Sequence, residues 1–77
     1  MFSKKGPLPL TAWPVGQGGM ITELKTEDKG QLQKLISLGL IPNVEIILLR
    51  NRPCWIVQVG FTRLALDAEL AEIIMVG

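Results

Sequence analysis

The chain has 77 residues and is expected to form one small domain. Its single cysteine excludes an internal disulfide, and the absence of histidine excludes a Ser–His or Cys–His catalytic pair and an ordinary zinc site. With a net charge of +1 it lacks the basic excess typical of nucleic-acid binders, and no apolar run approaches the roughly 20 residues that span a bilayer.

The N-terminal part of the chain is rich in glycine and proline. Residues 1–9 are expected to form a flexible lead-in, because one glycine and two prolines interrupt regular structure there. The domain then covers residues 10–77. Its first segment, residues 10–19, is predicted to be a turn in which the ring of Trp13 packs over one end of the core. A first strand is predicted over residues 20–24.

An amphipathic helix is predicted over residues 26–39. Thr26 or Asp28 can cap its first turn, because short polar side chains accept hydrogen bonds from the free backbone N–H groups at that end. The spacing i, i+3, i+4, i+7 predicts one apolar stripe that faces the core, formed by Leu32, Leu35, Ile36 and Gly39.

The helix is predicted to stop at a glycine and to lead into a tight turn. Gly39 is expected in the left-handed conformation of a C-terminal cap, with Leu40 folded back on Ile36. Pro42 and Asn43 favour the two central positions of a type I or type II turn, because proline fixes a negative φ and asparagine tolerates a positive one. These residues are therefore expected to set how the helix meets the next strand.

The strand predicted over residues 44–50 is apolar on both faces. Ile47 and Leu49 lie where a half-exposed strand would carry polar residues. They form either an exposed patch for a partner or a surface that the helix or the N-terminal segment covers. The opposite face, which we expect to point into the core, holds Val44, Ile46 and Leu48.

The C-terminal third contains three further short strands and a helical turn. A strand is predicted over residues 54–60, and a bend at Gly60 leads into another strand over residues 61–67. Asp67 caps a short helical turn, and the last strand covers residues 73–76. Five short strands, one helix and glycine at the corners indicate a mainly β fold, a small and strongly bent barrel.

Few residues suggest chemistry. Cys54 is interpreted as a small apolar residue at a strand start, and no catalytic set is evident. Carboxylates at the start of the helix could bind a hard cation, but the spacing of Glu23, Glu27 and Asp28 matches no known loop.

A tryptophan and two arginines lie close together in the sequence. Trp55, Arg50 and Arg52 have the composition of peptide-binding grooves and interface hot spots. The alternation of Trp55 with Val57 and Val59 instead favours a core position for the indole.

Several short motifs follow one another in a distinctive order. They are Trp13-Pro14-x-Gly16, Leu-x-x-Leu-Gly-Leu-x-Pro over residues 35–42, "EIILLR" over residues 45–50 and Ala71-x-x-Ile74-x-Val76. In this order and spacing they resemble the FeoA family, the small cytosolic proteins of bacterial and archaeal ferrous iron uptake. The resemblance extends over about residues 8–76 and implies an SH3-like barrel of about five strands.

The resemblance also implies a function. It indicates a cytoplasmic accessory protein that binds a partner and is not an enzyme. We expect no cofactor and no metal site. The implied partner is FeoB, the membrane Fe(II) transporter with a cytosolic GTP-binding domain, so that the chain meets the membrane only through that partner. A homodimer is as compatible with the sequence as a monomer. Docking is expected through an apolar barrel edge with a polar rim, formed by Leu40, Ile41, Ile47, Leu49, Arg50 and Arg52.

Two other functions stay open. A small barrel can bind nucleic acid, here through Arg50, Arg52 and Trp55, although we expect no nucleic-acid partner. The family's module also occurs fused to metal-dependent repressors of the diphtheria-toxin-regulator kind. A metal-responsive regulatory domain that binds Fe(II) directly through carboxylates is therefore the second alternative.

Overall fold

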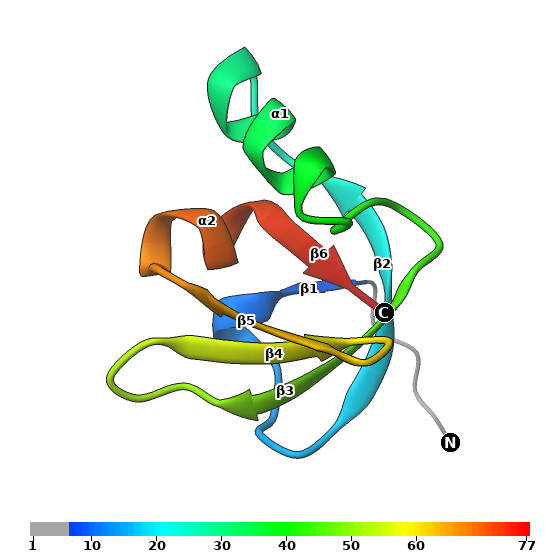
Figure 1. Ribbon diagram of the computed structural model, residues 1–77, viewed down its shortest axis with the longest axis vertical. Helices are drawn as coiled ribbons and strands as arrows, with labels where there is room; N and C mark the ends of the chain where they lie inside the picture. The colour runs from blue at the N-terminus through cyan, green and yellow to red at the C-terminus, as the bar shows by residue number, and fades with distance from the viewer. Residues whose placement is uncertain (1–6) are drawn as a thin grey trace.

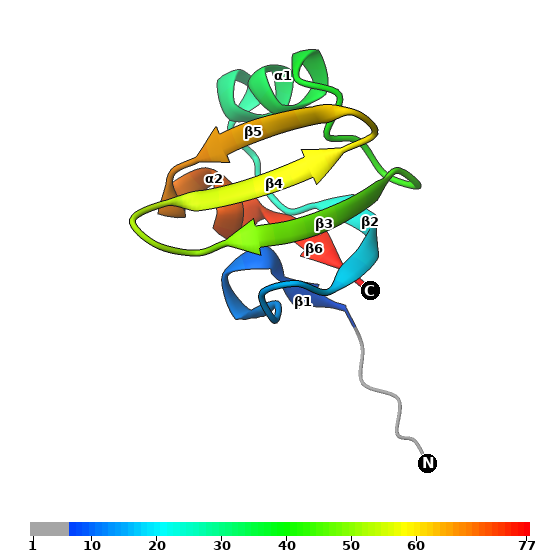
Figure 2. The same cartoon turned by 60° about the horizontal axis from the view of Figure 1, so that its bottom comes forward.

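A computed structural model describes residues 7–77 (Figures 1 and 2). Most of the expected lead-in, residues 1–6, lies outside the described residues, whereas Leu8 and Pro9 form a two-residue strand. The elements in chain order are β1 (Leu8–Pro9), a 3-10 turn (Leu10–Ala12), β2 (Gly18–Leu24), α1 (Lys29–Ser37), β3 (Glu45–Arg50), β4 (Trp55–Val59), β5 (Thr62–Leu66), α2 (Ala68–Ile73) and β6 (Ile74–Val76).

The strands form one antiparallel sheet in the order β1-β6-β2-β3-β4-β5. Strand β2 changes its partner along its length: Gly18–Met20 pair with β3, and Ile21–Leu24 pair with β6 with a register shift between Ile21 and Glu23. One strand thus belongs to both halves of the sheet, and the sheet wraps around the core (Figure 2). The prediction of a mainly β, strongly bent barrel is confirmed, with β1 as an additional short strand.

Glycine in β2 lets an aromatic ring approach the strand closely. A Cβ atom at Gly19 would lie 2.5 Å from Cζ2 of Trp13 and 2.6 Å from Cγ1 of Val76, so no larger residue fits there without a shift. The indole of Trp13 packs against the core, as predicted, and its Nε1 donates to the carbonyl oxygen of Gln17 at 2.9 Å.

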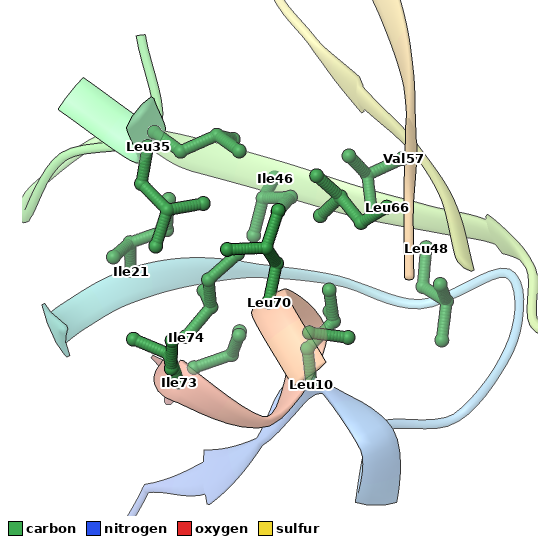
Figure 3. Packing of buried hydrophobic residues seen from close by; sticks show 13 residues of the cluster. Leu10, Ile21, Leu35, Ile46, Leu48, Val57, Leu66, Leu70, Ile73 and Ile74 are labelled. Atoms are coloured by element: carbon green, nitrogen blue, oxygen red, sulfur yellow. The ribbon is translucent and has the colours of Figure 1, made fainter. Parts of the chain in front are cut away.

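Every fully buried residue among residues 7–77 is apolar, and these residues come from the 3-10 turn, both helices, strands β2 to β6 and the segment after α1 (Figure 3). Each fully buried leucine or isoleucine contributes about 1.5–3 kcal/mol to folding. The core consists of Leu10, Ile21, Leu35, Leu40, Ile46, Leu48, Val57, Leu66, Leu70, Ala71, Ile73, Ile74 and Val76. The predicted alternation therefore holds for β3, and the inward positions predicted at Ile74 and Val76 are confirmed.

Helix α1 begins later than predicted and buries less. Asp28 has an extended backbone conformation, and its Oδ1 accepts hydrogen bonds from Gly30 N at 2.8 Å and Gln31 N at 3.1 Å, so the helix starts at Lys29. Of the predicted apolar stripe only Leu35 is fully buried, and Ile36 is 49% exposed. The predicted core-facing stripe therefore holds only in part. Leu32 is half-buried beside the buried Leu35, whereas Ile36 faces solvent, because α1 projects from the barrel (Figure 1).

The C-terminus of α1 has the predicted glycine cap. Gly39 has a φ of +85°, and its N–H donates to Ile36 O at 2.9 Å. The N–H of Leu40 donates to Leu35 O at 2.9 Å, which completes the pair of hydrogen bonds of a Schellman motif. The apolar contact expected for this motif joins Leu40 to the residue five positions earlier, and both are fully buried. The expected contact of Leu40 with exposed Ile36 is thus corrected to Leu35.

The turn after this cap is tied to β2. Val44 N donates to Ile41 O at 3.3 Å and Asn43 has a φ of +74°, which identifies a type II turn with Pro42 at its second position. Asn43 N also donates to Ile21 O at 2.7 Å, and Ile21 N donates to Val44 O at 2.9 Å. The turn therefore fixes β3 and the end of α1 against the middle of β2.

The C-terminal elements follow the predicted order. A two-residue turn of Gly60 and Phe61 joins β4 to β5. Gly60 has a positive φ of +61° and Phe61 does not, which indicates a type II′ turn. Asp67 caps α2 by accepting a hydrogen bond from Leu70 N at 2.9 Å, and α2 packs over the 3-10 turn. Neither helix is long and apolar enough to cross a membrane, as judged from residues 7–77.

Candidate interaction surface

One face of the sheet combines apolar and basic side chains. In β3, β4 and β5 the residues that alternate with the core residues point outward, since successive side chains of a strand lie on opposite faces. The register pairs Ile47 with Gln58 and Gln58 with Arg63, and it pairs Arg50 with Ile56 and Ile56 with Ala65. These residues, together with Leu49 at the register shift in β3, are here called the outer face.

The outer face contains a hollow of about 460 Å³. Two apolar side chains, Leu49 and Ile56, and two guanidinium groups, Arg50 and Arg63, line it. Leu49 and Ile56 are half-buried, and both arginines are exposed. An apolar floor beside two cations suits a ligand that carries both an apolar group and a negative charge.

A short hydrogen-bond chain orients Arg63 on this face. Nε of Arg63 donates to Oε1 of Gln58 at 3.4 Å, and Nε2 of Gln58 donates to the carbonyl oxygen of Gly60 at 3.1 Å. The Gln58 amide is thereby anchored to the hairpin turn. Because a guanidinium has five N–H donors, the four on the two terminal nitrogens of Arg63 stay available to a partner.

The structure brings together some of the predicted docking residues. Ile47, Leu49 and Arg50 lie on the outer face, and Arg52 lies exposed in the turn between β3 and β4. Ile47 also lines a second hollow, of about 430 Å³, where β3 meets Gly18 and Met20 of β2. Ile47 is 39% exposed, which resolves the alternative in which another element covers it.

Two predicted docking residues lie elsewhere. Leu40 is fully buried by the helix cap, so a partner cannot reach its side chain in the folded protein, and it is withdrawn from the docking set. Ile41 is 39% exposed but belongs to the type II turn beyond α1, apart from the outer face. Gly39, Pro42 and Asn43 form the cap and the turn described above.

Sequence reasoning missed Ile56 and Arg63 as members of the surface. Ile56 is out of phase with Trp55 and Val57, which was a sufficient signal for an outward position. Arg63 is distant in sequence from Arg50, and only the pairing of β5 with β4 brings it to the same face. Trp55 packs against the core, so the core interpretation of this residue is confirmed.

A second exposed apolar region lies on and near α1. Ile36 and Leu38 at the end of the helix are exposed, as is Ile41 in the following turn. A hollow beside the helix is lined by Gly30, Gln33, Lys34, Ile36 and Ser37, which are mainly polar. Within residues 7–77 no group of three or more Asp, Glu, Cys or His side chains is placed to hold a metal ion, and Cys54 is a half-buried free thiol.

The sequence matches a family model, the FeoA domain, over residues 8–77. No curated protein matches it. Among solved structures, an iron uptake regulatory protein (FeoA) is 31% identical with a TM-score of 0.83, and the alignment covers 92% of this chain and 95% of that one. The FeoA of Stenotrophomonas maltophilia, solved with zinc and described as a prokaryotic SH3 domain protein, is 24% identical with a TM-score of 0.77, over 88% of this chain and 87% of that one.

The same fold occurs within longer regulators. The IdeR of T. acidophilum is 21% identical with a TM-score of 0.86, and the alignment covers 99% of this chain but 36% of that protein. At this identity the likeness shows the fold alone. The chain therefore spans about a third of this regulator's length. It has the SH3-like barrel fold, and the outer face is one face of the sheet in that barrel.

Proposed function

The chain belongs to the FeoA family, and from this premise we propose that it is an accessory protein of ferrous iron uptake that binds the cytosolic part of a FeoB-like membrane transporter. In this proposal the chain is cytoplasmic, reaches the membrane only through the transporter and acts by binding, not by catalysis. The family match over residues 8–77 supports the connection to ferrous iron transport.

The observation that carries the binding proposal is the outer face. It presents Ile47, Leu49 and Ile56 beside Arg50 and Arg63, an apolar centre with a charged rim, as protein interfaces commonly have. Aromatic residues and arginine often carry the largest share of interface energy, and here two arginines border the hollow. We place the docking site on this face, with Arg52 at its rim.

The test is a calorimetric titration of the chain with the cytosolic portion of the FeoB-like transporter from the same organism. We expect binding with a dissociation constant of roughly 50 µM or tighter, as for transient regulatory contacts. GTP hydrolysis by the transporter domain is measured in the same samples. An absence of binding at about 100 µM contradicts the proposal.

Two matched variants locate the docking face. Ile47→Asp places a charge in the outer face and is expected to weaken binding by about tenfold or more, because an unpaired carboxylate would be desolvated there. Ile36→Asp makes the same change at an exposed isoleucine of α1 and is expected to leave the affinity unchanged. The opposite result moves the docking site to the α1 region.

A further inference from the structure

β5 is an edge strand with free backbone groups. It stands last in the sheet order, so only one of its edges is paired. In a hairpin with a two-residue turn, the residues that flank the turn, Val59 and Thr62, form a hydrogen-bonded pair. Because hydrogen-bonded and non-hydrogen-bonded pairs alternate, Val57–Leu64 and Trp55–Leu66 are hydrogen-bonded pairs too, and the pairs that contain Arg63 and Ala65 are not. The N–H and C=O groups of Arg63 and Ala65 consequently point away from β4.

These groups are accessible. Arg63 and Ala65 are both exposed, and within residues 7–77 neither forms a backbone hydrogen bond outside the sheet. Figure 2 shows β3, β4 and β5 in succession, with β5 at the end of this layer. An extended segment could therefore add one further strand to the sheet and satisfy four backbone groups.

The side chains beside this edge indicate which side chains an added segment should have. A strand added to β5 would place alternate side chains on the outer face, opposite Arg63 and opposite Ala65. The Arg63 guanidinium, oriented by Gln58, favours a carboxylate. Ala65 is small and lies next to half-buried Ile56, so the neighbouring position leaves room for a large apolar side chain.

A second copy of this chain fits the edge poorly. Pairing of two β5 strands would bring Arg50 and Arg63 of both copies onto one continuous face, where charges of like sign repel. An arginine on an edge strand also discourages pairing with purely apolar strands. The edge is thus selective for an acidic segment.

We propose that the free edge of β5 binds an extended acidic segment of a partner protein by strand addition, with a carboxylate at Arg63 and, two residues away, a large apolar side chain over Ala65 and Ile56. This proposal rests on the proposed function, since it names the chemistry of the segment through which the transporter would dock.

The first test compares three variants in the titration with the cytosolic portion of the transporter. Arg63→Glu reverses the charge of the side chain that would bind the carboxylate. Ala65→Pro removes a backbone N–H that faces the free edge, and a sheet tolerates proline at such a position because no hydrogen bond within the sheet is lost. Each is expected to weaken binding by about tenfold or more. Lys29→Glu makes the same charge change at the start of α1, away from the edge, and is expected to bind like the wild type. Wild-type affinity in both edge variants overturns the proposal.

The second test does not depend on whether Ala65→Pro folds. Amide hydrogen exchange of the wild-type chain is followed residue by residue with and without the transporter domain. The N–H groups of Arg63 and Ala65, free before binding, are expected to become protected. Unchanged exchange at both in a saturated complex overturns strand addition while the proposed function stands. Protection of both in the free chain, with a doubled mass in sedimentation, assigns the edge to a second copy instead.

A synthetic peptide separates the two proposals if the transporter domain does not bind. The peptide acetyl-Thr-Val-Glu-Val-Leu-Val-Thr-amide carries the glutamate and the leucine two residues apart, and its control has lysine in place of glutamate. Protection of the Arg63 and Ala65 amides by the acidic peptide alone supports the edge site even though the transporter proposal has failed. No protection by either peptide overturns the edge site.

Discussion

The barrel and helix α1 use apolar residues in different ways. In β3 the predicted inward residues Ile46 and Leu48 are fully buried, and the outward Ile47 is partly exposed. In α1 four positions follow an equally regular helical spacing, yet only Leu35 is fully buried. Periodicity therefore tells which side chains share a face, and the fold decides how much of that face finds a neighbour.

The difference has a geometric cause. A strand inside a curved sheet has neighbours on both sides and a core beneath it, whereas α1 lies outside the sheet and has one fully buried side chain, Leu35. The helix has nine residues, too few for a stable isolated helix. Local contacts hold it instead: the Asp28 cap at one end, and the Gly39 cap with the Leu35 and Leu40 pair at the other.

The sharpest test of the barrel is Ile46→Ala. Removing a fully buried side chain of β3 is expected to lower the free energy of unfolding by about 2–5 kcal/mol, because a cavity remains. The adjacent substitution Ile47→Ala, on the outer face, is expected to cost less than about 1 kcal/mol. Urea denaturation followed by tryptophan fluorescence measures both. Equal losses would show that β3 is not oriented as described.

The junction between the two regions is tested by Asn43→Pro. Proline cannot adopt the φ of +74°, and it also removes the N–H that donates to Ile21 O at 2.7 Å. The combined strain and unsatisfied carbonyl are expected to cost about 3 kcal/mol. Asn43→Gly keeps both the conformation and the N–H, so its melting temperature should stay close to that of the wild type. A stable proline variant would refute the turn and its attachment to β2.

The smallest effect is expected on α1, for Ile36→Ala. This side chain is 49% exposed, so the free energy of unfolding should change by no more than about 0.5 kcal/mol. Leu35→Ala, one position earlier and fully buried, is expected to cost about 2–5 kcal/mol. Thermal denaturation compares the two. A large loss at Ile36 would mean that α1 packs more broadly than its exposure indicates.

Local signals were the most readily predicted from sequence. Gly39 and Asn43 adopt the positive φ angles that a cap and a type II turn require, and Asp67 caps α2. These features depend on residues within a few positions of one another. The position of Leu40 shows the limit of such reasoning, because the sequence assigned this residue both to the cap and to the docking edge, and the structure shows that the cap buries it completely.

The sequence by itself determined the class of fold, the positions of the turns and helix caps, and the family. Turn residues and strand alternation act locally, and the motifs can be compared directly with those of the family. Tertiary structure alone decided the division of β2 between two halves of the sheet, the projection of α1 and the meeting of Arg50, Ile56 and Arg63 on one face. These features arise from strand register and sheet curvature, which join residues far apart in sequence. The free edge of β5 belongs to the same group, because an edge exists only once the order of the strands is fixed.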